Sequence, residues 1–382
     1  MKIRKIVQNF NIKIFIYFLI IITAVYTLAF TWIFNLKDDG YILADWLINY
    51  QDGGFKRRGL SGSFFFILQD LTKIRLNYIV YFFQFLIIGG FFWIYTKLIT
   101  YKRTDFLYLS LLLSAIGFIG LLNTVTYVGK KEFIVFLLFT CFVYLLDHGK
   151  LSGAKEYLFC VFLCISTLLH EVTLFYVPYF AIALYAKTGK LEYKRYVKYF
   201  IAVGVPTLLI MLFGKNVNEG MSLEILSKRG VHPTYGIFYW NIDERQYIKE
   251  HINEYKLYFI SLAISIFHIG YYLKYLNGRK LLSILLIGAF LFSFPLFYLA
   301  IDWGRWMYIH MMLMIVLFTI LLRNGESVYT FEPTFINKKF YITLGIIVLS
   351  LLYRVEMSGY GFTFEGILYR AFVAPLELLN KI

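Results

Sequence analysis

Long apolar runs recur along almost the whole of this 382-residue chain, separated by short polar segments. A helix needs about 20 apolar residues to cross the hydrocarbon core of a bilayer, and about 17 suffice. Runs of roughly that length lie at 14–34, 76–97, 105–122, 132–147, 157–170, 172–186, 199–213, 257–273, 281–300, 306–322 and 340–353. The pattern predicts an all-α, polytopic transmembrane helix bundle with about 11 spans. We expect it to form a single integral membrane domain over residues 1–382.

The composition excludes the main alternatives to a membrane protein. Hydrophobic residues make up 60% of the chain, and 40 Phe with 33 Tyr exceed what one soluble core of this size can bury. Cys141, Cys160 and Cys164 all lie in apolar runs, so neither a disulfide framework nor a thiolate metal site is expected. The net charge of +15 comes from short basic clusters between apolar runs, which is typical of cytoplasmic loops and not of nucleic-acid binding.

The charge distribution predicts the direction of the chain. Runs 157–170 and 172–186 are separated only by His170 and Glu171, so they form either one long tilted helix or two short ones that turn there. If the chain turns at His170 and Glu171, every short basic loop, including 187–198 and 277–280, lies in the cytoplasm, as the positive-inside rule favours. We therefore expect a cytoplasmic N-terminus and an extracytoplasmic C-terminus. The short pair itself fits two spans or a re-entrant hairpin.

The first run follows a basic N-terminus, as in a signal peptide. Its apolar stretch is too long for one and no small-residue cleavage site follows, so we expect a retained helix. In this topology most of the 23 acidic residues lie outside the cell, and any chemistry is expected there. The exterior segment 214–256 is long enough to form a lid.

The first exterior loop, residues 35–75, is the most informative segment. Its spacing predicts two helices lying along the membrane surface, over 41–50 and 63–73. The glycine-rich turn between them carries Arg57 and Arg58, whose planar guanidinium groups suit phosphate oxygens. We count Asp52 of the same turn among the substrate-binding candidates. The alternative is that the basic residues bind lipid headgroups or only anchor the loop.

Two pairs of ionisable residues are the candidate catalytic groups. Asp38 or Asp39, directly after the first run, could accept a proton from an incoming hydroxyl, or both could be an ordinary hydrated helix end. Ionisable groups at membrane depth are usually functional, so His170 and Glu171 are expected to line a polar cavity. There they could carry a proton or bind a sugar hydroxyl. Alternatively they form a structural turn that is paired with Arg305 or with the Lys130–Lys131 pair.

Two further exterior turns complete the set of candidates. Asp302, Trp303 and Arg305 lie between two spans, where Trp303 could stack on a sugar and Arg305 could bind phosphate. An internal Asp302–Arg305 ion pair is the alternative. Lys130 and Lys131 are weaker phosphate candidates, because such loops are often merely solvated. No nucleotide, protease or hydrolase motif occurs, and neither a cofactor nor a metal site is indicated, although a divalent metal is compatible with the pattern.

The many spans, the acidic residue after the first span and the two surface helices of the first exterior loop resemble the integral-membrane glycosyltransferases of the C-type fold (GT-C). The chain also resembles the O-antigen and capsule repeat-unit polymerases. The resemblance covers roughly residues 1–100 and does not depend on a long shared motif. It implies a bacterial cytoplasmic membrane protein that transfers sugar outside the cell from a polyprenyl-(pyro)phosphate donor to a glycan or lipid-linked acceptor. By position it implies Asp38 or Asp39 as the base, with Arg57, Arg58 and Arg305 on the phosphate.

Larger GT-C enzymes carry a C-terminal soluble domain that has no counterpart here, which favours polysaccharide over protein as the acceptor. Two other functions fit the same sequence. A transporter or flippase of lipid-linked sugars would use His170 and Glu171 as a coupling site. A membrane acyltransferase that modifies surface sugars would use a histidine near the membrane surface to activate a hydroxyl.

Overall fold

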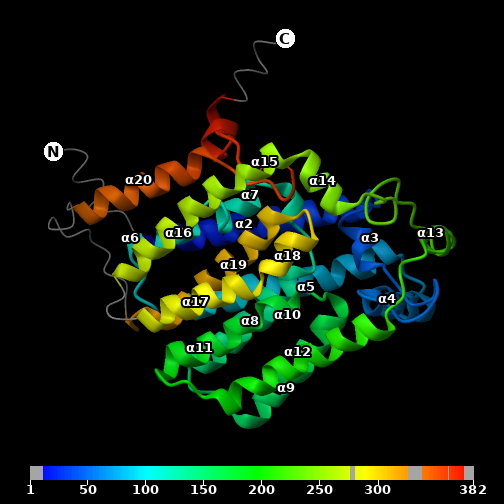
Figure 1. Ribbon diagram of the computed structural model, residues 1–382, viewed down its shortest axis with the longest axis horizontal. Coiled ribbons are helices and arrows are strands. Elements are labelled where there is room, and N and C mark those ends of the chain that lie inside the picture. Colours follow the sequence, from blue (N-terminus) through cyan, green and yellow to red (C-terminus); the bar gives the residue numbers. More distant parts are fainter. Residues whose placement is uncertain (1–11, 276–279, 326–337, 360, 374–382) are drawn as a thin grey trace. The chain divides into compact units, whose positions relative to one another are not determined.

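The computed structural model describes residues 12–275, 280–325, 338–359 and 361–373 (Figure 1). The basic residues at the N-terminus and most of the predicted 277–280 turn lie outside the described residues. Within them every regular element is helical, and the only other pairings are two isolated bridges, Lys102 with Asn324 and Arg354 with Thr363. The predicted all-α fold class is confirmed.

Six helical stretches of the described chain are long and apolar enough to cross a membrane, which fits a multi-pass protein. They are Ile12–Leu36 (α2), Leu76–Thr100 (α5), Tyr193–Phe213 (α12), Ile252–Lys274 (α15 and α16), Lys280–Leu299 (α17 and α18) and Trp303–Leu321 (α19 and η2). All six fall on predicted runs.

The other predicted spans are shorter or divided. Helices α8 (Glu132–Asp147), α9 (Gly153–Leu169) and α20 (Lys338–Leu352) have 16, 17 and 15 residues. The run at 105–122 is not one helix but two, α6 (Phe106–Leu112) and α7 (Phe118–Asn123), because residues 113–117 between them are not helical. Eleven spans thus stay a prediction.

Two compact units make up the structure. Unit 1 comprises residues 1–25, 95–127 and 243–382, and unit 2 comprises 26–94 and 128–242. The remaining helices of unit 1 are η1 (Val125–Tyr127), α14 (Glu244–Glu250), α15 (Ile252–Lys256), α16 (Tyr258–Lys274), α17 (Lys280–Phe292), α18 (Phe294–Leu299), α19 (Trp303–Phe318), η2 (Thr319–Leu321) and η4 (Tyr369–Val373). Nearly every side chain of α19 is buried, as its apolar residues on all faces require.

Unit 2 contains α3 (Leu43–Trp46), α4 (Gly59–Thr72), α8, α9, α10 (Thr173–Tyr176), α11 (Pro178–Thr188), α12 and α13 (Glu219–Lys228). The chain reverses after α9, where His170 adopts an extended conformation (φ −158°, ψ 106°). The start of α9 and the start of α12 lie together, since Arg195 binds Glu156 at 2.6 Å. The connecting helices α10 and α11 must therefore run back in the direction opposite to α9. The predicted turn at His170 and Glu171 is therefore present, whereas its side of the membrane stays a prediction.

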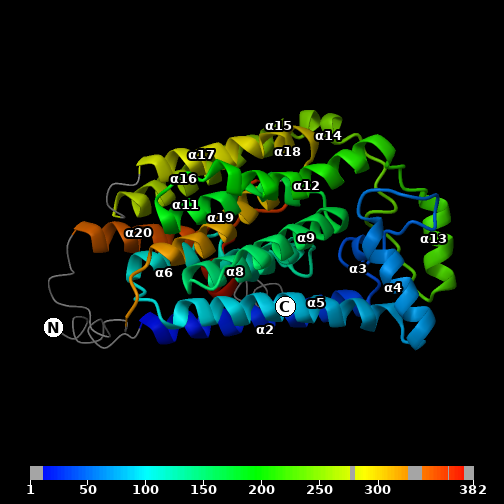
Figure 2. The ribbon, with the colours of Figure 1, turned by 90° about the horizontal axis from the view of Figure 1, so that it is seen from below.

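The first loop differs from the prediction in its first half. Only Leu43–Trp46 is helical within 41–50, and all four residues are buried instead of lying on a membrane surface. Asp39 and Trp46 draw the segment inward, because Asp39 accepts hydrogen bonds from the amides of Tyr41 and Ile42 while the indole of Trp46 donates to Gly129. The second predicted helix is present as α4 and begins four residues earlier. In Figure 2, α3, α4 and α13 gather at one end of unit 2. The predicted lid, 214–256, is divided between the two units at residue 243.

Candidate functional site

Three segments of unit 2 meet through buried charged side chains. They are the first loop, the start of α8 and the turn after α9. The side chains that meet, which we call the ion cluster, are Asp45, Arg58, Lys131, Glu132, His170 and Glu171. A mixture of cations and carboxylates in one place is stable only if each charge faces an opposite one.

Arg58 links the first loop to the turn after α9. Its Nη2 lies 2.7 Å and its Nε 3.0 Å from carboxylate oxygens of Glu171, and its Nη1 lies 3.1 Å from Oδ1 of Asp45. Burial alone would lower the pKa of the guanidinium, but Glu171 and Asp45 hold that pKa above its ordinary value. The residue has a left-handed backbone (φ 63°), which is costly for an arginine and persists here because the side chain is bound on both sides.

Lys131 is the deepest cation of the ion cluster. Its side chain is fully buried, with Nζ 3.7 Å from Oδ2 of Asp45 and 5.8 Å from the ring centre of Trp46. Within the described residues this ammonium has no hydrogen-bond partner. Burial lowers the pKa of Lys131 to about 8, and Asp45 opposes that shift.

His170 lies between two carboxylates. Its Nε2 is 3.0 Å from Glu132 and its Nδ1 is 3.6 Å from Glu171, and the ring has no exposed surface. The three carboxylates of the ion cluster thus face three basic side chains, those of Arg58, Lys131 and His170.

Only one edge of the ion cluster reaches the surface. The side chain of Glu171 is 22% exposed, and that of the neighbouring Arg57 is 60% exposed with Nη1 3.7 Å from Glu171. Burial would raise the pKa of Glu171, but Arg58 and His170 hold it well below its usual range, so the group is a carboxylate at neutral pH. A ligand therefore meets Glu171 and Arg57 first, whereas Arg58 lies behind them and is already bound.

Asp38 and Asp39 form a different network in the same unit. Asp38 accepts hydrogen bonds from Asn77 at 2.6 Å and from the amide of His232 at 2.8 Å. Besides the two amides of the first loop, Asp39 accepts a hydrogen bond from Tyr235 at 2.5 Å, and this bond raises the pKa of the phenol to about 12. Both carboxylates thus attach the segment after α13 to the first loop.

Two other predicted residues of unit 2 also bind their own chain. Asp52 forms a fully buried ion pair with Lys56 and accepts a hydrogen bond from Ser222 of α13. Lys130 donates to the carbonyl of Tyr41 at 3.0 Å. These contacts hold the first loop in place.

The predicted site residues of unit 1 form a packed turn. Arg305 pairs with Asp302 at 3.0 Å, which is the alternative that the sequence left open. Trp303 packs against Tyr255, at a centroid distance of 5.2 Å, and against Phe297, at 5.8 Å. Trp303, predicted to stack on a sugar, is therefore half-buried among aromatic side chains of its own chain.

Sequence reasoning did not assign Asp45 and Glu132 to the site, although both carry ion pairs in it. A sequence pattern could have identified them: each is a single acidic residue beside an apolar run, close to the cations of a neighbouring loop. No group of three His, Cys, Asp or Glu suited to a metal ion occurs in the described part of the chain.

Comparison of the chain with protein-family models, with curated proteins and with solved structures finds no match. The function must therefore be inferred from the geometry of the ion cluster and from the sequence pattern.

Proposed function

We propose that this protein is an integral membrane glycosyltransferase of the bacterial cytoplasmic membrane. It transfers a sugar or an oligosaccharide on the extracytoplasmic face, from a polyprenyl-(pyro)phosphate donor to a glycan or lipid-linked acceptor. Cell-surface polysaccharide assembly, including repeat-unit polymerisation, is the process that this chemistry serves. The proposal includes a GT-C-like architecture.

The observation that carries the proposal is the exposed edge of the ion cluster, where a carboxylate and an exposed guanidinium lie side by side. Glu171 is fixed by Arg58, while Arg57 is only loosely paired at 3.7 Å. Sugar transfer from a phosphate ester needs these two groups together: an acceptor for the hydroxyl proton and a cation for the departing phosphate.

The proposed reaction forms one bond and breaks one. The acceptor hydroxyl oxygen attacks the anomeric carbon, and its proton passes to the carboxylate of Glu171. The bond between the anomeric carbon and the phosphate oxygen breaks, and its electron pair leaves with the phosphate, whose growing charge Arg57 stabilises. His170, 3.6 Å from Glu171 and held by Glu132, can take the proton onward.

This proposal changes the role expected for Arg58. Its side chain is 13% exposed and its guanidinium is already bound to Glu171 and Asp45, so Arg58 is a positioning residue that orients the carboxylate. The phosphate role passes to Arg57. Asp38 and Asp39 become anchors of the loop, because both oxygens of each carboxylate accept hydrogen bonds from this chain.

Transfer by the purified protein is the test, with a panel of polyprenyl-(pyro)phosphate sugars in detergent. Glu171→Gln keeps the shape of the side chain but removes the base, so kcat should fall by about 10²–10⁴-fold. Arg57→Gln should lower kcat/KM for the donor by about 10²-fold. Glu219→Gln and Lys194→Gln, which change exposed residues elsewhere in unit 2, are the matched controls.

Equal activity in Glu171→Gln and in its control would contradict the assignment. Absence of transfer by the unaltered protein, together with gradient-driven movement of lipid-linked sugars across sealed vesicles, would favour a flippase instead. In that case His170 and its two carboxylates would be the coupling site.

A further inference from the structure

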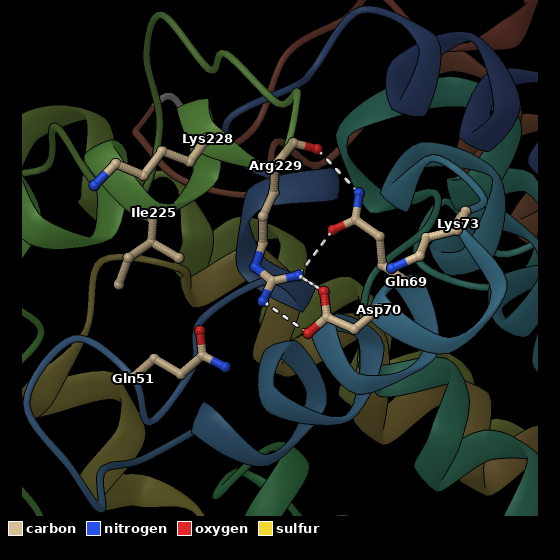
Figure 3. Close-up of a pocket in the computed structure, with 7 residues that line it drawn as sticks. All are labelled: Gln51, Gln69, Asp70, Lys73, Ile225, Lys228 and Arg229. Atoms are coloured by element: carbon tan, nitrogen blue, oxygen red, sulfur yellow. Dashed lines mark hydrogen bonds and ion pairs between the residues drawn. The ribbon is translucent and has the colours of Figure 1, made fainter.

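A polar hollow of about 520 Å³ lies at the end of α4, apart from the side chains of the ion cluster. Its lining residues are Gln51, Gln69, Asp70, Lys73, Ile225, Lys228 and Arg229. Figure 3 shows Ile225 and Lys228 of α13 on one side of Arg229, and Gln69, Asp70 and Lys73 of the α4 end on the other. Its volume is within the usual range of ligand sites, about 300–1,000 Å³.

One wall of the hollow is held rigidly. The guanidinium of Arg229 binds both oxygens of Asp70, at 2.9 and 3.1 Å, and the side-chain oxygen of Gln69 at 3.0 Å. Gln69 returns a hydrogen bond to the carbonyl of Arg229 at 3.1 Å, and the guanidinium stacks on Phe66 at 4.3 Å. These polar groups need no reordering when a ligand binds, which lowers the cost of binding.

The lining is positively charged, with three cations and one carboxylate. Arg229 is neutralised by Asp70, so the excess charge belongs to Lys73 and Lys228. Lys73 is the left-handed residue that ends α4, and Lys228 is paired with Glu224 at 2.6 Å. Both side chains of this second pair are largely exposed, and such pairs are weak enough to exchange for a phosphate.

An apolar stripe begins beside the hollow. Phe64, Ile67, Leu71 and Ile74 are exposed at helical spacing along α4 and just beyond it, with Leu71 75% exposed. The next helix, α5, starts at Leu76 and is one of the candidate spans. Exposed apolar side chains next to a span face lipid, and the cationic residues beside them lie at the level of the headgroups.

We propose that this hollow binds the phosphate headgroup of a membrane amphiphile, whose hydrocarbon chain lies along the α4 stripe. Lys73 and Lys228 bind the phosphate oxygens, and the amide groups of Gln51 and Gln69 bind the remaining polar atoms of the headgroup. An anionic phospholipid and a prenyl phosphate share this chemistry. The site is independent of the sugar transfer proposed above.

Equilibrium binding to the purified full-length protein tests the proposal by native mass spectrometry. The probes are dioctanoyl phosphatidylglycerol with dioctanoylglycerol as its phosphate-free partner, and farnesyl phosphate with farnesol. The variant is Lys73→Asn with Lys228→Gln, since asparagine tolerates the left-handed backbone at 73. Lys194→Gln, an exposed residue at the far end of α12, is the control.

We expect the unaltered protein to bind at least one phosphate probe about tenfold more tightly than its phosphate-free partner, and the double variant to lose that preference. The phosphate probe that the double variant no longer prefers shows whether the hollow binds a phospholipid headgroup or a prenyl phosphate. Equal binding of phosphate and phosphate-free probes would overturn the proposal. Unchanged binding in the double variant, or an equal loss in Lys194→Gln, would overturn it as well.

Discussion

Arg57 and Arg58 are adjacent residues in different environments, and this difference predicts a large loss of stability on replacing Arg58 but only a small one on replacing Arg57. Arg58 faces two carboxylates with 13% of its side chain exposed, whereas Arg57 is 60% exposed. Removing one partner of a buried ion pair leaves an uncompensated charge, so Arg58→Met should lower the free energy of unfolding by about 3–5 kcal/mol. Arg57→Met should cost less than about 1 kcal/mol. Thermal unfolding of the two purified variants is the measurement, and equal midpoints would contradict the buried pairing.

Lys131 predicts how stability depends on pH. Burial lowers its pKa in the folded protein to about 8 from an ordinary value of 10.5, so the unfolded chain binds more protons between these pH values. The free energy of unfolding should therefore rise as the pH increases from about 8 to about 10.5, by up to about 3 kcal/mol. Lys131→Met removes this contribution and keeps the other titrating groups. If the unaltered protein and the variant show the same change in unfolding midpoint over this range, Lys131 is not buried as an ammonium.

At the level of elements, the close approach of α4 to the first loop depends on Gly62. Its amide donates to the carbonyl of Ile48 at 3.0 Å, and a Cβ at this position would lie 2.4 Å from the carbonyl oxygens of Leu47 and Ile48. Backbone atoms cannot yield as a flexible side chain does, so Gly62→Ala should destabilise the protein by about 1–3 kcal/mol or more.

Gly89 in the middle of α5 is the matched control, because a Cβ there meets nothing within 4 Å. Gly89→Ala should be neutral or stabilise the protein by up to about 1 kcal/mol, since alanine loses less backbone entropy in a helix. Chemical or thermal unfolding of both variants separates the steric effect from helix propensity. A Gly62→Ala variant as stable as Gly89→Ala would show that α4 can move away from the loop.

The same loop shows what periodicity can and cannot predict. The apolar residues Ile42, Trp46 and Tyr50 recur at helical spacing, but a four-residue turn is enough to bury 43–46. The deciding contacts are the carboxylate of Asp39, which binds two amides, and the carbonyl of Gly129, which accepts from Trp46. Gly129 is distant from Trp46 in the sequence, and the bonds of Asp39 form only in this particular turn. The spacing of hydrophobic residues therefore does not predict either contact. α4 starts directly after Arg58, which has a left-handed backbone conformation. Arginine rarely adopts this conformation, so residue propensities do not predict where α4 starts.

For the whole molecule, the sequence predicts which residues are apolar enough for a membrane, and the six long helices agree with it. It also predicts the turn at His170 and Glu171, because positive charges in neighbouring loops require it. It does not predict which charged side chains meet. His170 and Arg58 are linked through Glu171, whereas Asp38, Asp39 and Asp52 bind other parts of their own chain. These choices depend on tertiary contacts between α4, α8 and α9.

The direction of the chain across the membrane can be tested with α12, which has 21 residues and is therefore about 31 Å long. Lys190 precedes this helix and Lys215 follows it, and both side chains are exposed. In a variant with Cys141, Cys160 and Cys164 replaced by serine, a cysteine at 215 should react with a membrane-impermeant maleimide in intact cells. A cysteine at 190 should react only after the membrane is permeabilised, because the positive-inside rule places it in the cytoplasm. His170 lies at the same end of unit 2 as the C-terminus of α12. The reverse labelling pattern would therefore put the exposed edge at Glu171 and Arg57 on the cytoplasmic side. Sugar transfer outside the cell would then be impossible at this site.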